Sequence, residues 1–162
     1  MAIRHTLFAY LFVVVIVCLS TGCRNKAEAE KQVALVHEHH SPHGGTAVVL
    51  GDELYHLELV RDSNEGTLTA YVLDSEMENF VRIAQTTLTL NIKTNTSVLP
   101  LTLSAVENSA TGEKIGDTSE FQIKSEFITR TAEFDADLKL ITVNIHTFSE
   151  VHFNFPRGND RD

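Results

Sequence analysis

Short runs of alternating apolar and polar residues dominate the chain from Thr46 onward. Such a period of two is typical of strands with one buried face, and it differs from the 3.6-residue period of an amphipathic helix. Residues that favour turns separate the runs. The clearest apolar sets are Leu68, Ala70 and Val72; Leu88, Leu90 and Ile92; Leu99, Leu101 and Leu103; Ile141, Val143 and Ile145; and Val151, Phe153 and Phe155. The sequence therefore predicts an all-β protein.

The alternating runs predict about seven to nine short strands in antiparallel pairs. The expected strands span residues 46–50, 54–61, 67–74, 80–83, 87–93, 98–106, 120–124, 140–146 and 151–155. Residues 107–118 are expected to form a polar, mobile loop, and residues 127–138 an irregular segment or a helical turn. The expected architecture is an antiparallel β-sandwich, immunoglobulin-like, with a small open barrel as the alternative.

Residues 1–22 are expected to be a signal peptide. Arg4 provides a positive start, and residues 7–17 form an apolar stretch that is too short to span a bilayer comfortably. The small residues before Cys23 resemble the lipobox of bacterial lipoproteins, in which the cysteine becomes lipidated at the new N-terminus. We therefore expect a lipid anchor at Cys23 and a polar tether over residues 23–35. Ordinary secretion is the alternative if Cys23 is not lipidated.

The expected location is the cell envelope, where a periplasmic or outer-membrane lipoprotein is held to the membrane by its lipid. Removing 22 residues from 162 leaves 140, which suits one domain over residues 46–157 and a polar tail over residues 158–162. Without Arg4, 12 of the 13 Lys and Arg residues remain against 22 Asp and Glu residues. This acidic balance disfavours nucleic acid as a partner. No small-molecule substrate is evident.

Histidines are concentrated in residues 36–45, immediately before the first expected strand. Four of them lie within seven residues: His37, His39, His40 and His43. Neutral imidazole is a common ligand for Cu, Zn and Ni. The histidine-rich segment is therefore expected to capture one of these transition metals, for buffering, sensing or delivery.

A ligand on a rigid strand would hold the ion better than the histidine-rich segment alone. His56 and Glu58 alternate onto one face of the expected strand 54–61, beside the chain that enters it. His56 would ligate, and Glu58 would either ligate or orient an imidazole that binds the ion. The expected metal site comprises His37, His39, His40, His43, His56 and Glu58.

Other interpretations remain open at this point. The histidine-rich segment could be only a solvated linker, and the domain would then be a non-enzymatic module that binds an envelope protein. His146 and His152, with Glu150 nearby, are a weaker candidate for holding a metal. Enzyme function is not expected, because the chain has no Gly-x-Ser-x-Gly elbow, no His-Glu-x-x-His helix and no phosphate-binding glycine loop.

Three short motifs carry a resemblance: His43-Gly44-Gly45, then Leu50-Gly51-Asp52, then Tyr55-His56-Leu57-Glu58-Leu59. They resemble a pattern in small exported bacterial proteins, mostly uncharacterised lipoproteins of the planctomycete type, and residues 119–123 and 140–155 fit that family too. The motifs are also similar to segments of the periplasmic adaptor subunits of heavy-metal efflux pumps. The latter resemblance implies metal contacts at His43 and His56, although the long helical hairpin of the adaptors is missing from this sequence.

Overall fold

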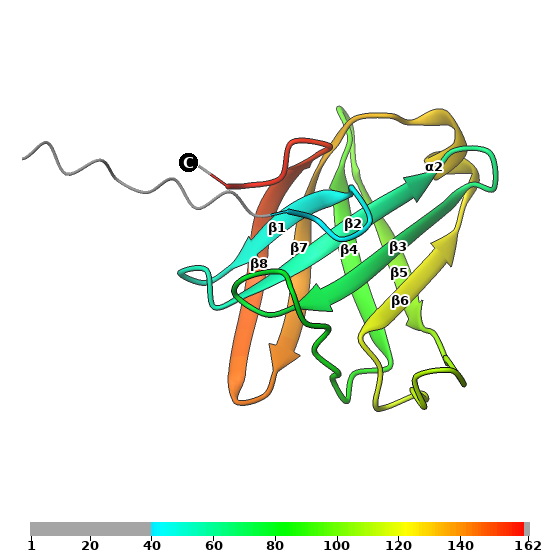
Figure 1. Cartoon of the computed structure of the whole chain (residues 1–162). Helices are drawn as coiled ribbons and strands as arrows, with labels where there is room; N and C mark the ends of the chain where they lie inside the picture. Colours follow the sequence, from blue (N-terminus) through cyan, green and yellow to red (C-terminus); the bar gives the residue numbers. More distant parts are fainter. Residues whose placement is uncertain (1–39, 161–162) are drawn as a thin grey trace, which may run out of the picture. The chain divides into compact units, whose positions relative to one another are not determined.

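The computed structural model describes residues 40–160, which contain eight strands and one short helix (Figure 1). The elements are β1 (Thr46–Leu50), β2 (Tyr55–Asp62), β3 (Thr67–Leu73), β4 (Thr87–Lys93), β5 (Val98–Ala105), β6 (Glu120–Lys124), α2 (Glu126–Arg130), β7 (Phe134–Val143) and β8 (His146–Phe155). The expected signal peptide, the tether with Cys23, and His37 and His39 lie outside the described residues. Between residues 40 and 160, no helix has the length and hydropathy needed to cross a membrane.

All eight strands belong to one antiparallel sheet in the order β1-β2-β3-β6-β5-β4-β7-β8. The sheet curls until its edge strands β1 and β8 approach each other, so that it nearly closes into a barrel (Figure 1). The turn after β8 joins the two edges, because Thr46 Oγ1 donates to Pro156 O at 3.0 Å and Asn159 bonds the backbone of Val49 at 2.7 and 3.2 Å. The all-β prediction is confirmed, with the small open barrel as its form.

Alternate residues of the strands fill the interior of this barrel, as the period of two predicts. The sets at 68–72 and 88–92 are at most 1% exposed, and Phe121 and Phe153 pack among them. Ile145 was expected inside but is 90% exposed. The reason is that the β7–β8 turn lies at Asn144-Ile145, where Asn144 adopts a positive φ of 54° that asparagine tolerates.

Four segments differ from the expectation. In the closing hairpin, residues 147–150 belong to β8 and the turn lies at residues 144–145. Residues 80–83 do not form a strand. They make only two isolated bridges, Phe80 with Leu73 at the end of β3 and Ile83 with Thr118 at the end of the 107–118 loop. Residues 127–138 combine the end of α2 with the start of β7, since Ser125 caps the helix and the strand alternation resumes at Phe134. The 107–118 loop is folded by two bridged turns.

Candidate functional site

The candidate site lies on the outer face of the sheet, where register places three polar side chains side by side. Leu57 and Leu59 point into the barrel, so Glu58 between them points outward. Glu58 is paired with Tyr71 of β3, and Tyr71 is paired in turn with Glu120 of β6. Glu58, Tyr71 and Glu120 therefore form one row across three neighbouring strands, called here the outer-face row.

Glu58 has no exposed surface although it points outward, because residues 43–45 cover it. Its Oε1 accepts hydrogen bonds from the backbone nitrogens of His43 at 2.8 Å and Gly45 at 2.9 Å. Its Oε2 lies 2.9 Å from His43 Nδ1. A buried carboxylate thus receives three donors, which satisfies it and fixes the end of the histidine-rich segment against β2.

His43 is held by two contacts. The Glu58 carboxylate accepts only, so the ring donates its Nδ1–H, and Nε2 carries the lone pair in the neutral imidazole. The ring also stacks on Tyr71, with centroids 4.1 Å apart and planes at 17°, and Phe80 lies 5.8 Å away. The His43 side chain keeps 38% exposure. The site therefore presents an oriented imidazole to solvent.

The two glycines after His43 have different functions in this arrangement. Gly44 closes the turn that begins at Ser41, with a φ of +67° that an L side chain rarely adopts. Gly45 is required for close approach, because an added Cβ would lie 2.6 Å from Leu59 O and 2.8 Å from Glu58 Cγ. The Gly44-Gly45 pair thus lets the histidine-rich segment turn and then press onto β2.

We expect Gly45→Ala to lower the free energy of unfolding by about 1–3 kcal/mol, because the new methyl group meets backbone and displaces Glu58. Gly44→Ala is the matched control, since nothing lies within 4 Å of its Cβ and only the positive φ costs about 1 kcal/mol. Urea denaturation followed by circular dichroism measures both values. A cost at Gly44 equal to or larger than that at Gly45 would contradict the close packing.

The other predicted ligands lie in different surroundings. His40 is exposed on the chain that leads to the turn. His56 shares the outer face of β2 with Glu58 but is completely buried, and its Nδ1 lies 3.1 Å from Asp74 O. The structure therefore brings His43 and Glu58 into contact. Across residues 40–160 it contains no group of three or more His, Cys, Asp or Glu side chains placed to hold a metal ion.

His146 and His152 are separated in the structure. Both belong to β8, where His146 pairs with Val143 near the turn and His152 pairs with Asp137. Both therefore lie on one strand, six residues apart, and the structure does not bring them together. His152 Nδ1 lies 3.0 Å from Asp137 Oδ1, in an exposed contact that also involves Lys93.

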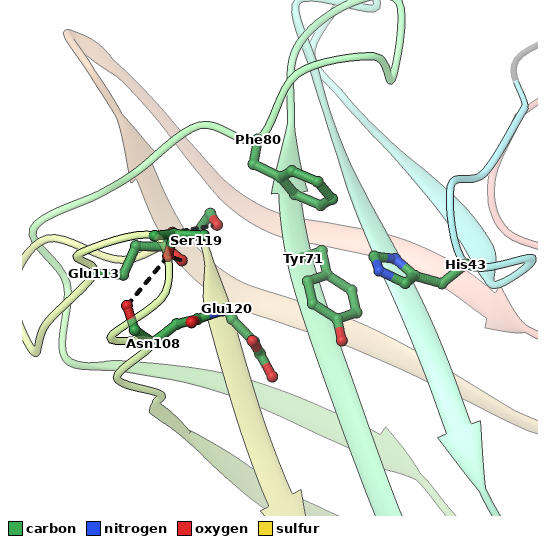
Figure 2. Close-up of a pocket in the computed structure, with 8 residues that line it drawn as sticks. His43, Tyr71, Phe80, Asn108, Glu113, Ser119 and Glu120 are labelled. Atoms are coloured by element: carbon green, nitrogen blue, oxygen red, sulfur yellow. Dashed lines mark hydrogen bonds between the residues drawn. The ribbon is translucent and has the colours of Figure 1, made fainter.

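A cavity of about 250 Å³ adjoins the outer-face row (Figure 2). Its lining residues are His43, Tyr71, Phe80, Asn108, Thr111, Glu113, Ser119 and Glu120. Among these residues, only His43 was predicted from the sequence as a site residue. The alternation in the sequence does place Tyr71 and Glu120 on the outward faces of their strands. Only the pairing register of the strands places them beside His43.

The pKa values of the two carboxylates in this cavity are shifted in opposite directions. Burial and the nearby Glu113 carboxylate raise the pKa of Glu120, against a smaller lowering by His43. Burial also acts on Glu113, but hydrogen bonds from Ser119 and Thr111 and the charge of Arg82 outweigh it and lower the pKa of Glu113. Burial, Glu120 and Glu58 together raise the pKa of Tyr71. The cavity thus holds one compensated carboxylate, Glu113, and one uncompensated carboxylate, Glu120.

We expect Glu120→Gln to raise the melting temperature at pH 7. The raised pKa of Glu120 means that the folded protein binds this proton more tightly than the unfolded chain does, so ionisation of Glu120 costs stability as the pH rises. The advantage of glutamine should therefore shrink on acidification and vanish below about pH 4, where glutamate is protonated in both states. Thermal denaturation at pH 7 and at about pH 3.5 measures the difference.

Glu113→Gln is the matched comparison, and its effect should have the opposite sign. The lowered pKa of Glu113 means that its ionised form stabilises the folded protein at pH 7, and that this stabilisation is lost as the pH falls through the folded-state pKa. If both substitutions changed the melting temperature at pH 7 in the same direction, the opposite pKa shifts of the two carboxylates would be contradicted.

No protein-family model, curated protein or solved structure matches the chain. Evidence about function therefore comes from the sequence and from the geometry around His43. That geometry combines an oriented imidazole, a buried carboxylate behind it and an acidic cavity beside it.

Proposed function

We propose that the protein binds a transition metal ion, Cu, Zn or Ni, through its histidine-rich segment, with His43 as the ligand fixed to the domain. The observation that carries this proposal is the contact of 2.9 Å between His43 Nδ1 and the fully buried Glu58 carboxylate. Histidines that bind metals usually donate their second ring N–H to such an acceptor, which fixes the tautomer and raises the basicity of the ligating nitrogen. Glu58 thereby prepares His43 Nε2 for a metal.

The remaining ligands would come from His40, His37 and His39, which precede His43 in the sequence. Glu58 acts in this proposal as the orienting carboxylate, because its oxygens already accept three hydrogen bonds. His56 is not a ligand in this proposal, since it is completely buried and its Nδ1 lies within hydrogen-bonding distance of Asp74 O. One anchored imidazole and several on the adjoining segment suit capture and release of an ion.

The proposed setting is the cell envelope. The expected signal peptide and the lipobox-like residues before Cys23 support export and a lipid anchor, and the acidic composition supports attraction of cations to the domain. The protein would then buffer, sense or deliver a metal outside the cytoplasm without acting as an enzyme. A partner protein of the envelope would receive the ion in the delivery role.

Titration of the full chain with Zn(II), Ni(II) and Cu(II) at pH 7 tests the proposal. We expect saturable one-to-one binding with a Kd of about 1 μM or lower, weakened about tenfold or more by His43→Ala. His152→Ala is the matched control, because His152 also contacts a carboxylate but lies on β8, away from the segment. Binding should fall below about pH 6, where imidazoles become protonated.

Two results would contradict metal binding at His43. One is weak binding without saturation, which would make the histidine-rich segment a solvated linker and turn attention to the domain as a protein-interaction module. The other is an equal loss of affinity in His43→Ala and His152→Ala, which would show that histidines bind metal without regard to their surroundings.

A further inference from the structure

The cavity beside the outer-face row combines ring surfaces with carboxylates and has no lysine or arginine among its lining residues. Figure 2 shows Tyr71 standing between His43 on one side and Glu120 on the other, with Phe80 above it. Tyr71 and Phe80 meet edge to face, with centroids 5.9 Å apart and planes at 63°. Phe80 keeps 48% exposure, so apolar ring surface remains at the mouth of the cavity.

The two carboxylates differ in how far their charge is already compensated. Glu113 accepts from Ser119 N at 2.9 Å, from Ser119 Oγ at 2.6 Å and from Thr111 Oγ1 at 2.7 Å, and Arg82 Nε lies 3.7 Å away. Glu120 has no such set of donors among the described residues. Its carboxylate is half-buried beside Glu113, where a cation would relieve the repulsion between them.

We propose that this cavity binds the head group of an organic cation, an ammonium or a guanidinium, with Glu120 as the counter-charge and Tyr71 and Phe80 as the ring surfaces. Cations are attracted to aromatic faces, and the attraction grows when water is excluded. The head group could belong to a free amine or to a lysine or arginine side chain of a peptide, since both present the same chemistry.

Other ligand classes fit the cavity less well. An anion would meet the negative charge of Glu120, which no lysine or arginine of the lining balances. A neutral apolar group would leave the Glu120 carboxylate without a counter-charge in a drier environment. A bare metal ion would need three or more converging ligands, and the part of the chain from 40 to 160 shows no such group. This inference goes beyond the proposed metal binding, for which His43 Nε2 is the ligand atom.

Nuclear magnetic resonance titration of the full chain with tetramethylammonium and with guanidinium chloride tests the inference. EDTA is present throughout, so that metal binding does not contribute to the signal. If the proposed metal binding were wrong, the outcome of this titration would not change. We expect saturable shifts of the Tyr71 and Phe80 ring signals. tert-Butanol, a neutral molecule of similar shape, and sodium chloride at equal ionic strength should not reproduce them.

Variants locate the ligand in the cavity. Glu120→Gln should weaken binding about tenfold or more, and Phe80→Leu about two- to fivefold through loss of the ring. Asp137→Asn is the matched control on β7 and should bind as the unmodified protein does. Saturable binding of N-acetyl-lysine amide would assign the head group to a peptide, and binding of small amines alone would assign it to a free amine. Absence of saturable shifts, equal shifts with tert-butanol, or unchanged binding in Glu120→Gln would overturn the proposal.

Discussion

Glu58→Gln is expected to weaken Zn(II) binding about 10- to 100-fold while the protein stays folded. A glutamine can still accept the backbone N–H groups of His43 and Gly45 through its carbonyl oxygen. Its amide group, however, donates to His43 Nδ1, where the carboxylate accepted. The ring proton must then move to Nε2, which removes the lone pair that binds the metal. Competition with a chromophoric chelator measures the affinity.

Asp137→Asn is the matched control for this substitution. The Asp137 carboxylate contacts His152 Nδ1 at 3.0 Å, so the same change of group meets the same kind of partner away from the histidine-rich segment. We expect an unchanged affinity for Zn(II). Wild-type affinity in Glu58→Gln, or an equal loss in Asp137→Asn, would contradict the orienting role of Glu58. Glu58→Gln added to His43→Ala should cause no further loss, because the two residues act through one contact.

Phe121→Ala should lower the free energy of unfolding by about 3–5 kcal/mol. Phe121 has no exposed surface, and its partners in register are two alanines, Ala70 of β3 and Ala105 of β5. Such small neighbours cannot collapse into the space that the ring leaves. The ring also fills the point where β5 and β6 are joined by only two residue pairs. Urea denaturation followed by circular dichroism measures the change.

Phe80→Ala removes the same side chain from a site with 48% exposure, and it should cost less than about 1 kcal/mol. A similar cost for both variants would mean that Phe121 is not part of a close-packed interior. A change in the slope of the denaturation curve for Phe121→Ala alone would point instead to a less compact unfolded or folded state.

The fold class could be predicted from the sequence because burial imposes alternation on each strand separately. Leu68 and Val72, for example, identify their strand and its inner face without any knowledge of the neighbours. The closure of the sheet into a barrel was harder to predict from the sequence. The contacts that join its edges include those of Asn159 with the backbone of Val49, 110 residues earlier, and no local pattern in the sequence reports such contacts. Ile145 is a second example. It continues the apolar alternation of β7 but lies in the β7–β8 turn, so its side chain is exposed.

The candidate site was predictable in part for the same physical reason. Alternation alone placed His56 and Glu58 on one face of β2. Tyr71 and Glu120 belong to other strands, and β6 joins β3 only after β4 and β5 have intervened in the chain. Their place beside His43 follows from strand order and register, which a single sequence does not specify.

The tautomer of His43 is the most direct measure of the proposed metal site. A long-range ¹H–¹⁵N spectrum of the full chain at pH 7, recorded before and after one equivalent of Zn(II), reports both ring nitrogens. We predict a protonated Nδ1 and an unprotonated Nε2 without metal, and a large change at Nε2 on addition of zinc. A protonated Nε2 in the metal-free protein, or a His43 ring that does not respond to zinc, would contradict the account.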